Sequence, residues 1–287
     1  MTESYHISSS ALANRFQVEV LKALSFSFKE MGKDFIIIGA ASRDILRIYL
    51  KAEASTRRTK DLDIAIGVDT WDDFFLISET LQSKGFRKDP LMKQRFYFQN
   101  MDSAEYEIDI VPFGGVAKDD QNIYWPPEEN PRMSVKGFSS VLKDCINIIV
   151  DDDFSFKIPS VPAFFILKLD AWTDRHLLNN KDAKDMSYIL NNYYLHDVTK
   201  GLHLEICDIL SDNFDEYVAG AYMLANDIAA LLNPEELASY LQDINSELAL
   251  AENSALLNDC MIEGVTFDEV KEGWSMIATV FREAIGK

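Results

Sequence analysis

Cysteine and histidine are scarce in this sequence, and their spacing excludes two kinds of site. The chain has 3 cysteines and 4 histidines among 287 residues. Cys145, Cys207 and Cys260 lie far apart, and none has a second cysteine or a histidine at the spacing of metal ligands. We therefore expect buried thiols rather than a disulfide framework or a zinc site, and we assign no role to any histidine.

Long hydrophobic runs are also missing. No segment approaches the roughly 18 uninterrupted apolar residues that a membrane span requires. The N-terminal segment MTESYHISSS lacks the basic start and apolar core of a secretory leader. We expect a cytosolic protein without membrane association, and its 47% of hydrophobic residues can build the cores of about two domains.

Positive charge is scarce in the second half of the chain. Residues 1–150 carry 19 Lys and Arg against 22 Asp and Glu, whereas residues 151–287 carry 9 against 25. RNA and DNA bind proteins largely through neutralisation of their phosphates, so the second half is a poor platform for nucleic acid. Any nucleic acid should bind to residues 1–150.

The spacing of apolar residues predicts alternating helices and strands up to about residue 158. We expect helices over 14–31, 42–50 and 69–86, strands over 34–40, 61–68, 95–101, 106–113, 144–150 and 154–159, and a long loop over 116–137. From Ser160, a typical N-cap followed by Pro162, the pattern is almost entirely helical. This predicts an α/β (α+β) domain with a mixed sheet over 1–158 and a mainly α-helical domain over 159–287.

An acid pair begins the strand predicted over 61–68. Alternate residues of a strand face opposite sides, so Asp61 and Asp63 share one face while Leu62 and Ile64 point to the core. One explanation is a solvated surface, where such a pair costs only mild repulsion. The functional alternative is a divalent cation between the two carboxylates, since Mg²⁺ prefers carboxylate and phosphate oxygens.

The strand predicted over 106–113 offers a third carboxylate. Its apolar residues alternate with Glu105, Glu107 and Asp109, which therefore share the opposite face. A neighbouring strand with this pattern can bring one acid to the pair. Three such carboxylates are enough to hold two metal ions.

The segment FIIIGAASRD has the features of a phosphate site. A buried strand ends at Gly39, small residues follow, and a helix begins at about Ser42. Backbone N–H groups and the dipole at a helix N-terminus favour a phosphate group. Glycine is common where a strand meets a helix, so this segment indicates a phosphate site only in combination with the acids.

The first helix of the second domain carries two cations on one face. Lys168 and Arg175 are seven residues apart, a spacing that aligns them on a helix. A solvated charged face is one explanation, and contact with a triphosphate is the other. Asp182 and Asp185 in the next helical segment can pair with these cations or hold their helix in place.

In this order the motifs resemble those of the DNA polymerase β-like nucleotidyltransferase superfamily. RRTKDLDIAI is similar to the Arg-x-Ser/Thr-x-Asp-φ-Asp motif of the AbiEii-type nucleotidyltransferase toxins. SVPAFFILKLDAWTDRHLLNNKDAKDMSYIL resembles that family's Leu-Lys-x-x-Ala helix with its downstream Arg and Lys-Asp-x-x-Asp segment. The resemblance covers roughly residues 30 to 195 and includes Gly39, Ser42, Arg57 or Arg58, Thr59, Asp61, Asp63 and Asp109.

The resemblance implies an enzyme that moves a nucleoside monophosphate from an NTP to an acceptor hydroxyl and releases pyrophosphate. Asp61 and Asp63 would bind two Mg²⁺ ions, and Asp109 would bind one of them and position or deprotonate the hydroxyl. Lys168 would complete the catalytic set at the triphosphate. The implied nucleotide-binding residues are Gly39, Ala40, Ser42, Arg43, Thr59, Lys168 and Arg175. Ala40 departs from the second Gly or Ser of the family, so Ser42 and backbone N–H groups would grip the phosphate.

We expect the acceptor to be an RNA end, in particular of tRNA, because cations adjoin the acid pair. They form two groups, namely Arg57, Arg58 and Lys60, and Lys88, Lys93 and Arg95. The resemblance also implies a toxin-antitoxin system, in which a protein antitoxin is the partner.

Other functions stay open at this point. GAASRDIL is similar to the Gly-Gly-x-Val-Arg-Asp-x-Leu segment of CCA-adding tRNA nucleotidyltransferases, although the acidic second half lacks a basic body for gripping tRNA. A small-molecule nucleotidyltransferase is another alternative. Two further ones are a non-catalytic regulator that binds nucleotide and an interaction protein whose acidic half binds a basic partner.

Overall fold

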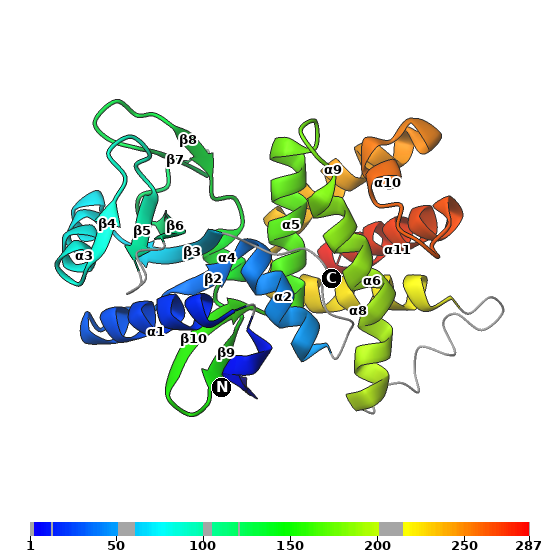
Figure 1. Ribbon diagram of the computed structural model, residues 1–287. Coiled ribbons are helices and arrows are strands. Elements are labelled where there is room, and N and C mark those ends of the chain that lie inside the picture. The colour runs from blue at the N-terminus through cyan, green and yellow to red at the C-terminus, as the bar shows by residue number, and fades with distance from the viewer. Residues whose placement is uncertain are drawn as a thin grey trace. The chain divides into compact units, whose positions relative to one another are not determined.

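The computed structural model describes residues 3–12, 14–50, 61–99, 105–119, 121–200 and 215–286, without the side chains of 196–200. Within these residues the chain divides into two compact units, which we call the N-terminal and the C-terminal unit (Figure 1). Apart from Leu50, which groups with the C-terminal unit, the division along the chain falls between Ser160 and Val161.

A mixed eight-stranded sheet forms the centre of the N-terminal unit in the part of the chain that is described. In spatial order its strands are β1 (Ser4–Ile7), β9 (Cys145–Val150), β10 (Phe154–Pro159), β2 (Ile36–Ile38), β3 (Asp61–Val68), β6 (Glu105–Gly114), β5 (Arg95–Gln99) and β4 (Phe86–Lys88). The pairs β1/β9, β10/β2 and β3/β6 are parallel, and the remaining neighbours are antiparallel. The predicted mixed sheet is therefore confirmed, while β1 and β4 had not been predicted.

Three longer helices and one short helix accompany this sheet. They are α1 (Arg15–Glu30), α2 (Gly39–Tyr49), α3 (Trp71–Ser83) and α4 (Phe138–Val141), with a 3₁₀ turn, η1, over Ser9–Ala11. In α1, Asn14 caps the N-terminus by accepting a hydrogen bond from the Gln17 N–H at 2.8 Å. Residues at helical spacing such as Leu21, Leu24 and Phe28 are buried. Helix α2 begins at Gly39, three residues before the predicted start, since the strand turns directly into it there.

The long loop predicted over 116–137 contains a second, two-stranded sheet. Strands β7 (Asn122–Tyr124) and β8 (Arg132–Ser134) pair antiparallel. The ring of Trp125 at their junction is fully buried and contacts Phe74 of α3, with ring centroids 5.2 Å apart. The prediction of one long loop was wrong, because three-residue strands carry too little alternation to be recognised.

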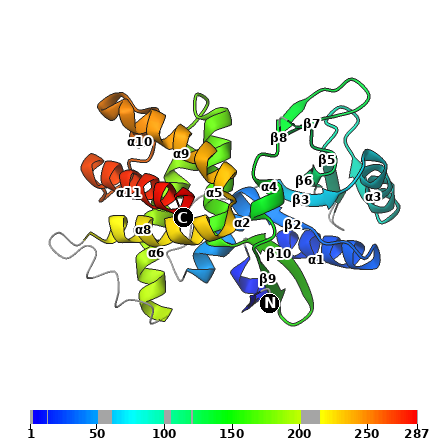
Figure 2. The same ribbon diagram turned by 180° about the vertical axis from the view of Figure 1, so that it is seen from behind.

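The C-terminal unit is helical, as predicted. It contains α5 (Val161–Arg175), α6 (Lys181–Lys200), α8 (Glu216–Leu231), α9 (Pro234–Ala249), the 3₁₀ turn η2 (Ala251–Asn253), α10 (Ala255–Asp259) and α11 (Phe267–Ile285). Helix α11 packs against α8 and α9 (Figure 2). Asn233 and Thr266 begin α9 and α11 with capping boxes, so the sequence marks both starts locally.

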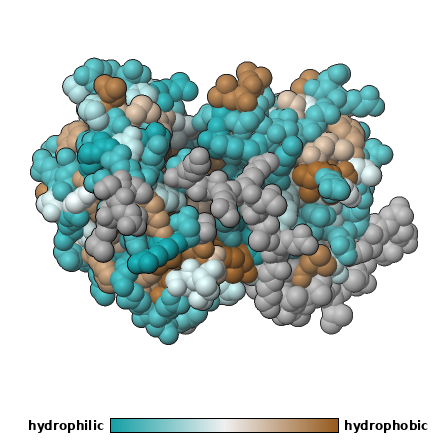
Figure 3. Space-filling view, viewed as in Figure 1, coloured by the Kyte–Doolittle hydropathy of each residue, from teal (hydrophilic) through white to brown (hydrophobic). Residues whose placement is uncertain are grey.

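The surface is mostly polar on the face shown in Figure 3, where hydrophobic residues form separate patches. Among the described residues, the most exposed large apolar side chains include Leu91, Leu177 and Leu178. None of the described helices is long and apolar enough to cross a membrane.

Candidate active site

The predicted acids lie on two adjacent, parallel strands. In the β3/β6 register, Asp63 is the partner of Asp109, and Asp61 is the partner of Glu107. Leu62 and Ile64 between them are fully buried, whereas Asp61 is exposed and Asp63 is half-buried. The alternation therefore places the acids on one face of the sheet. Neighbouring strands are about 4.8 Å apart, so three carboxylates start from neighbouring backbone positions.

Asp63 also lies against the first residue of α2. Gly39 has a φ of +68°, and a Cβ added there would be 2.1 Å from Asp63 Oδ2. Glycine is needed at this position both for the left-handed backbone and for the space that the carboxylate occupies. The carboxylate is consequently close to the N-terminus of α2, where backbone N–H groups and the helix dipole favour anions.

Asp109 is bound by the arginine directly across from it on β5. Arg95 donates from Nε to Oδ1 at 2.8 Å and from Nη2 to Oδ2 at 2.9 Å, and its Nη1 is 2.7 Å from a Glu107 oxygen. The hydrogen bond to Asp109 raises the pKa of Arg95 above its ordinary value, so the guanidinium stays charged. The sequence predicts Arg95 as part of an acceptor-binding cluster, but its spacing does not predict the contact with Asp109.

This contact bears on the predicted metal site. Among the described residues, no three His, Cys, Asp or Glu side chains converge to hold a metal ion. The donors nevertheless fit Mg²⁺ by chemistry, because all three are carboxylates and Asp61 is exposed with no ion pair in the described part of the chain. Asp109 can join them only if it exchanges its bonds to Arg95.

The predicted phosphate contacts of the N-terminal unit lie near the start of α2 or outside the described residues. Ala40 follows Gly39 at the helix start, and Ser42 is fully buried, with an Oγ that has no hydrogen-bond partner in the described chain. Arg43 is also buried, and its Nη2 is 2.8 Å from Asp44 Oδ1. Thr59 lies outside the described residues.

Lys168 and Arg175 belong to a buried ion-pair cluster in the C-terminal unit. The Nζ of Lys168 is 2.9 Å from Asp182 and 2.8 Å from Asp185, and its side chain is 6% exposed. Arg175 donates to both oxygens of Asp182, at 2.7 and 2.9 Å. Burial alone would raise the pKa of Asp182, but Arg175 and Lys168 outweigh it and lower the pKa below its ordinary value. The predicted pairing is confirmed, whereas the contact of Lys168 with a triphosphate stays a prediction.

The cations predicted to bind the acceptor are arranged differently from the expectation. Lys93 hydrogen-bonds the Pro126 carbonyl at 2.9 Å and pairs with Glu128, and Lys88 lies over the Phe74 and Phe96 rings. With Arg95 on Asp109, the cluster predicted over 88–95 is engaged inside the N-terminal unit. Arg57, Arg58 and Lys60 lie outside the described residues.

Comparison with known proteins gives distant structural similarities. No protein-family model and no curated protein matches the sequence. A nucleotidyltransferase-like antigenic protein from Paracoccidioides brasiliensis matches 75% of this chain and 94% of its own, at 14% identity and a TM-score of 0.45. JHP933 from Helicobacter pylori matches 98% of this chain and 94% of its own, at 14% identity and a TM-score of 0.34. The lincosamide antibiotic adenylyltransferase LnuA, solved with lincomycin, matches 60% of this chain and 94% of its own, at 17% identity and a TM-score of 0.35. Similarities of this size do not identify the chemistry of this chain.

Proposed function

We propose that this chain is a Mg²⁺-dependent nucleotidyltransferase that moves a nucleoside monophosphate from an NTP to an acceptor hydroxyl. One observation carries the proposal. Asp63 lies against Gly39, where α2 begins, and is also the register partner of Asp109. A helix N-terminus for phosphates and carboxylates for metal ions are the two parts that this chemistry requires.

The residues divide the work as follows. The N–H groups of the first turn of α2, together with Ser42, bind the phosphates of the NTP. Asp61, Asp63 and Asp109 hold Mg²⁺, which when bound neutralises the charge that develops on the phosphate oxygens. Positioning and charge neutralisation account for most of the catalysis in phosphoryl transfer, which is why no activated nucleophile of the protein is needed.

Asp109 has a second role in this proposal. It accepts the proton of the acceptor hydroxyl while the hydroxyl oxygen bonds to the α-phosphorus. The bond from the α-phosphorus to the bridging oxygen breaks, and pyrophosphate leaves with that electron pair. Asp109 must first release Arg95, which keeps its contact with Glu107, 2.7 Å away.

For the acceptor we propose an RNA end, in particular of tRNA, with a protein antitoxin as partner, as in the toxins that the motifs resemble. The support is the distribution of charge, since the second half of the chain is strongly acidic and the basic residues 57, 58 and 60 precede the acid pair. RNA should therefore reach the site across the N-terminal unit.

A non-catalytic nucleotide-binding regulator is the second candidate. It is favoured by the two hydrogen bonds between Arg95 and Asp109, which occupy the carboxylate that catalysis requires. Such a protein would bind NTP without consuming it.

Incubation with Mg²⁺, total cellular RNA and each of the four labelled NTPs distinguishes the two candidates. Label transferred to RNA, with pyrophosphate released, supports the proposed enzyme. Label in protein or in a small metabolite would retain the catalytic assignment and exclude RNA as acceptor. NTP that binds but is never consumed would favour the regulator.

A further inference from the structure

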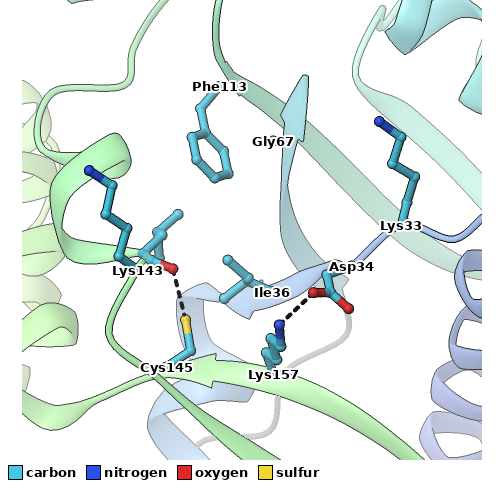
Figure 4. Close-up of a pocket in the computed structure, with 9 residues that line it drawn as sticks. Lys33, Asp34, Ile36, Gly67, Phe113, Lys143, Cys145 and Lys157 are labelled. Carbon is cyan, nitrogen blue, oxygen red and sulfur yellow. Dashed lines mark hydrogen bonds and ion pairs between the residues drawn. The ribbon is translucent and has the colours of Figure 1, made fainter. Parts of the chain in front are cut away.

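A cavity of about 250 Å³ (Figure 4) is lined by residues that follow the acids along β3 and β6. Gly67 and Phe113 line it and are register partners, four positions after Asp63 and Asp109. Because the pairing is unbroken and side chains alternate, all four positions share one face. Four residues of strand span about 13 Å.

Cations predominate around this cavity. Lys33, Lys143 and Lys157 line it with a single carboxylate, that of Asp34, which pairs with Lys157. Lys143 is exposed and has no ion pair within the described residues. In a chain with a net charge of −19, three lysines at one opening form a local site that attracts anions.

Apolar side chains also line the cavity, and an aromatic ring enters it. In Figure 4 the half-buried ring of Phe113 points into the space between Lys143 and Lys33. Gly67 presents no side chain beside the ring, and Ile36 and Cys145 add apolar surface. Burial raises the pKa of Cys145 to about 12, and its thiol donates to the Leu142 carbonyl at 3.1 Å, so the thiol is not a nucleophile.

These features select one class of ligand. Free phosphate would use the lysines but leave the ring and the apolar side chains without contacts. A single nucleotide of an unpaired strand uses both parts, because its base stacks on an aromatic ring and its phosphates meet cations.

We propose that this cavity holds one unpaired nucleotide of the acceptor RNA, with its base on Phe113 and its flanking phosphates at Lys33 and Lys143. This assignment rests on the proposed function, since the nucleotide in the cavity belongs to the RNA that serves as acceptor at the acid site, about 13 Å away along β3. A strand anchored there is directed along the sheet face toward Asp63 and Asp109. The cavity is thus an acceptor subsite, distinct from the NTP site at α2.

The test is binding of a short fluorescent single-stranded RNA with a free 3′-hydroxyl, compared with its 3′-terminal mononucleotide. Phe113→Leu keeps the apolar contact but removes stacking, and should weaken RNA binding roughly fivefold to a hundredfold. Lys143→Gln should lower the salt slope by about 1. Lys29→Gln, at an exposed lysine of α1, is the matched control and should leave the RNA affinity and its salt slope unchanged. Melting curves establish that each variant is folded.

Each outcome has a definite reading. Equal RNA binding by wild type, Phe113→Leu and Lys143→Gln would overturn the subsite, as would a mononucleotide that binds as tightly as the RNA. If either result is found and Asp63→Asn nevertheless loses nucleotide transfer, the proposed function is supported and the subsite is contradicted. If Phe113→Leu weakens RNA binding but Asp63→Asn transfers at full rate, the subsite stands and the catalytic proposal falls.

Discussion

Arg95 and Asp109 face each other across β5 and β6 and are joined by two parallel hydrogen bonds of 2.8 and 2.9 Å. This fork engages both oxygens of the third carboxylate and therefore competes with any cation for it. If the proposed Mg²⁺ site forms, Arg95 should set how readily Asp109 joins Asp61 and Asp63 around the ion.

Arg95→Gln should lower the Mg²⁺ concentration required for half-maximal binding several-fold, because Asp109 is released toward Asp61 and Asp63. Without metal the variant should lose about 1.5–3 kcal/mol of unfolding free energy, as a charged hydrogen-bonded partner is removed. Calorimetric titration with Mg²⁺ and urea unfolding measure the two effects. Arg87→Gln is the control, since Arg87 pairs at 2.7 Å with the outlying Glu105. Equal Mg²⁺ affinity in both variants would remove this role from Arg95.

Gly39→Ala should impair nucleotide transfer more than stability. The new Cβ would meet Asp63 Oδ2 at 2.1 Å, so the carboxylate has to leave its position. The left-handed φ adds about 1–2 kcal/mol of strain. Gly32→Ala is a matched control, because Gly32 has a φ of +63° and no atom within 4 Å of an added Cβ. Comparable loss of transfer in both variants would show that backbone strain, and not the displaced carboxylate, is responsible.

The acids could be predicted from the sequence because alternation fixes the face of each side chain. Leu62 and Ile64 are buried on one face of β3, so Asp61 and Asp63 lie on the other face. Neither the Asp63–Asp109 register nor the Gly39–Asp63 contact could be predicted in this way. Both depend on which strands pair, and that choice is made by packing across the whole sheet.

Lys168 shows a second limit. Helical spacing assigns it to a cationic face, but the carboxylates of Asp182 and Asp185 come from the next helix and surround its ammonium. Periodicity within one helix contains no information about the charges on its neighbour. The predicted pairing of Lys168 with Asp182 and Asp185 is confirmed, whereas the alternative of a solvated Lys168 is wrong because its side chain is buried.

Lys168→Met should destabilise the protein without ligand by about 3–5 kcal/mol, because Asp185 is left buried without its cation. Urea unfolding measures this loss, and Lys184→Met on α6 provides a half-exposed control. The predicted triphosphate contact is tested on the same folded variant at low temperature by its NTP affinity. Unchanged affinity would restrict Lys168 to a structural role, and unchanged stability would contradict the buried cluster.

The pH dependence of stability should report the same cluster. Because the pKa of Asp182 is below its ordinary value of 3.8 when folded, the unfolded chain takes up the proton first as pH falls. The stabilisation is therefore complete above about pH 5 and is lost on acidification toward and below pH 4. Asp182→Asn should flatten this part of the profile, while Asp174→Asn, at an exposed position of α5, should leave it unchanged. Parallel profiles for wild type and Asp182→Asn would contradict the assignment.

The most direct test of the central claim is the rate of pyrophosphate release by Asp63→Asn at saturating NTP and Mg²⁺ with the RNA acceptor. If Asp63 holds the metal ions beside Gly39 and Asp109, the rate should fall about a hundredfold or more, since a metal ion contributes several kcal/mol to the transition state. The melting temperature should change little, because repulsion with Asp61 is relieved while a favourable negative charge at the N-terminus of α2 is lost. Asp72→Asn, an exposed carboxylate in the first turn of α3, should retain the wild-type rate. A folded Asp63→Asn protein that releases pyrophosphate at the wild-type rate would contradict the proposed site.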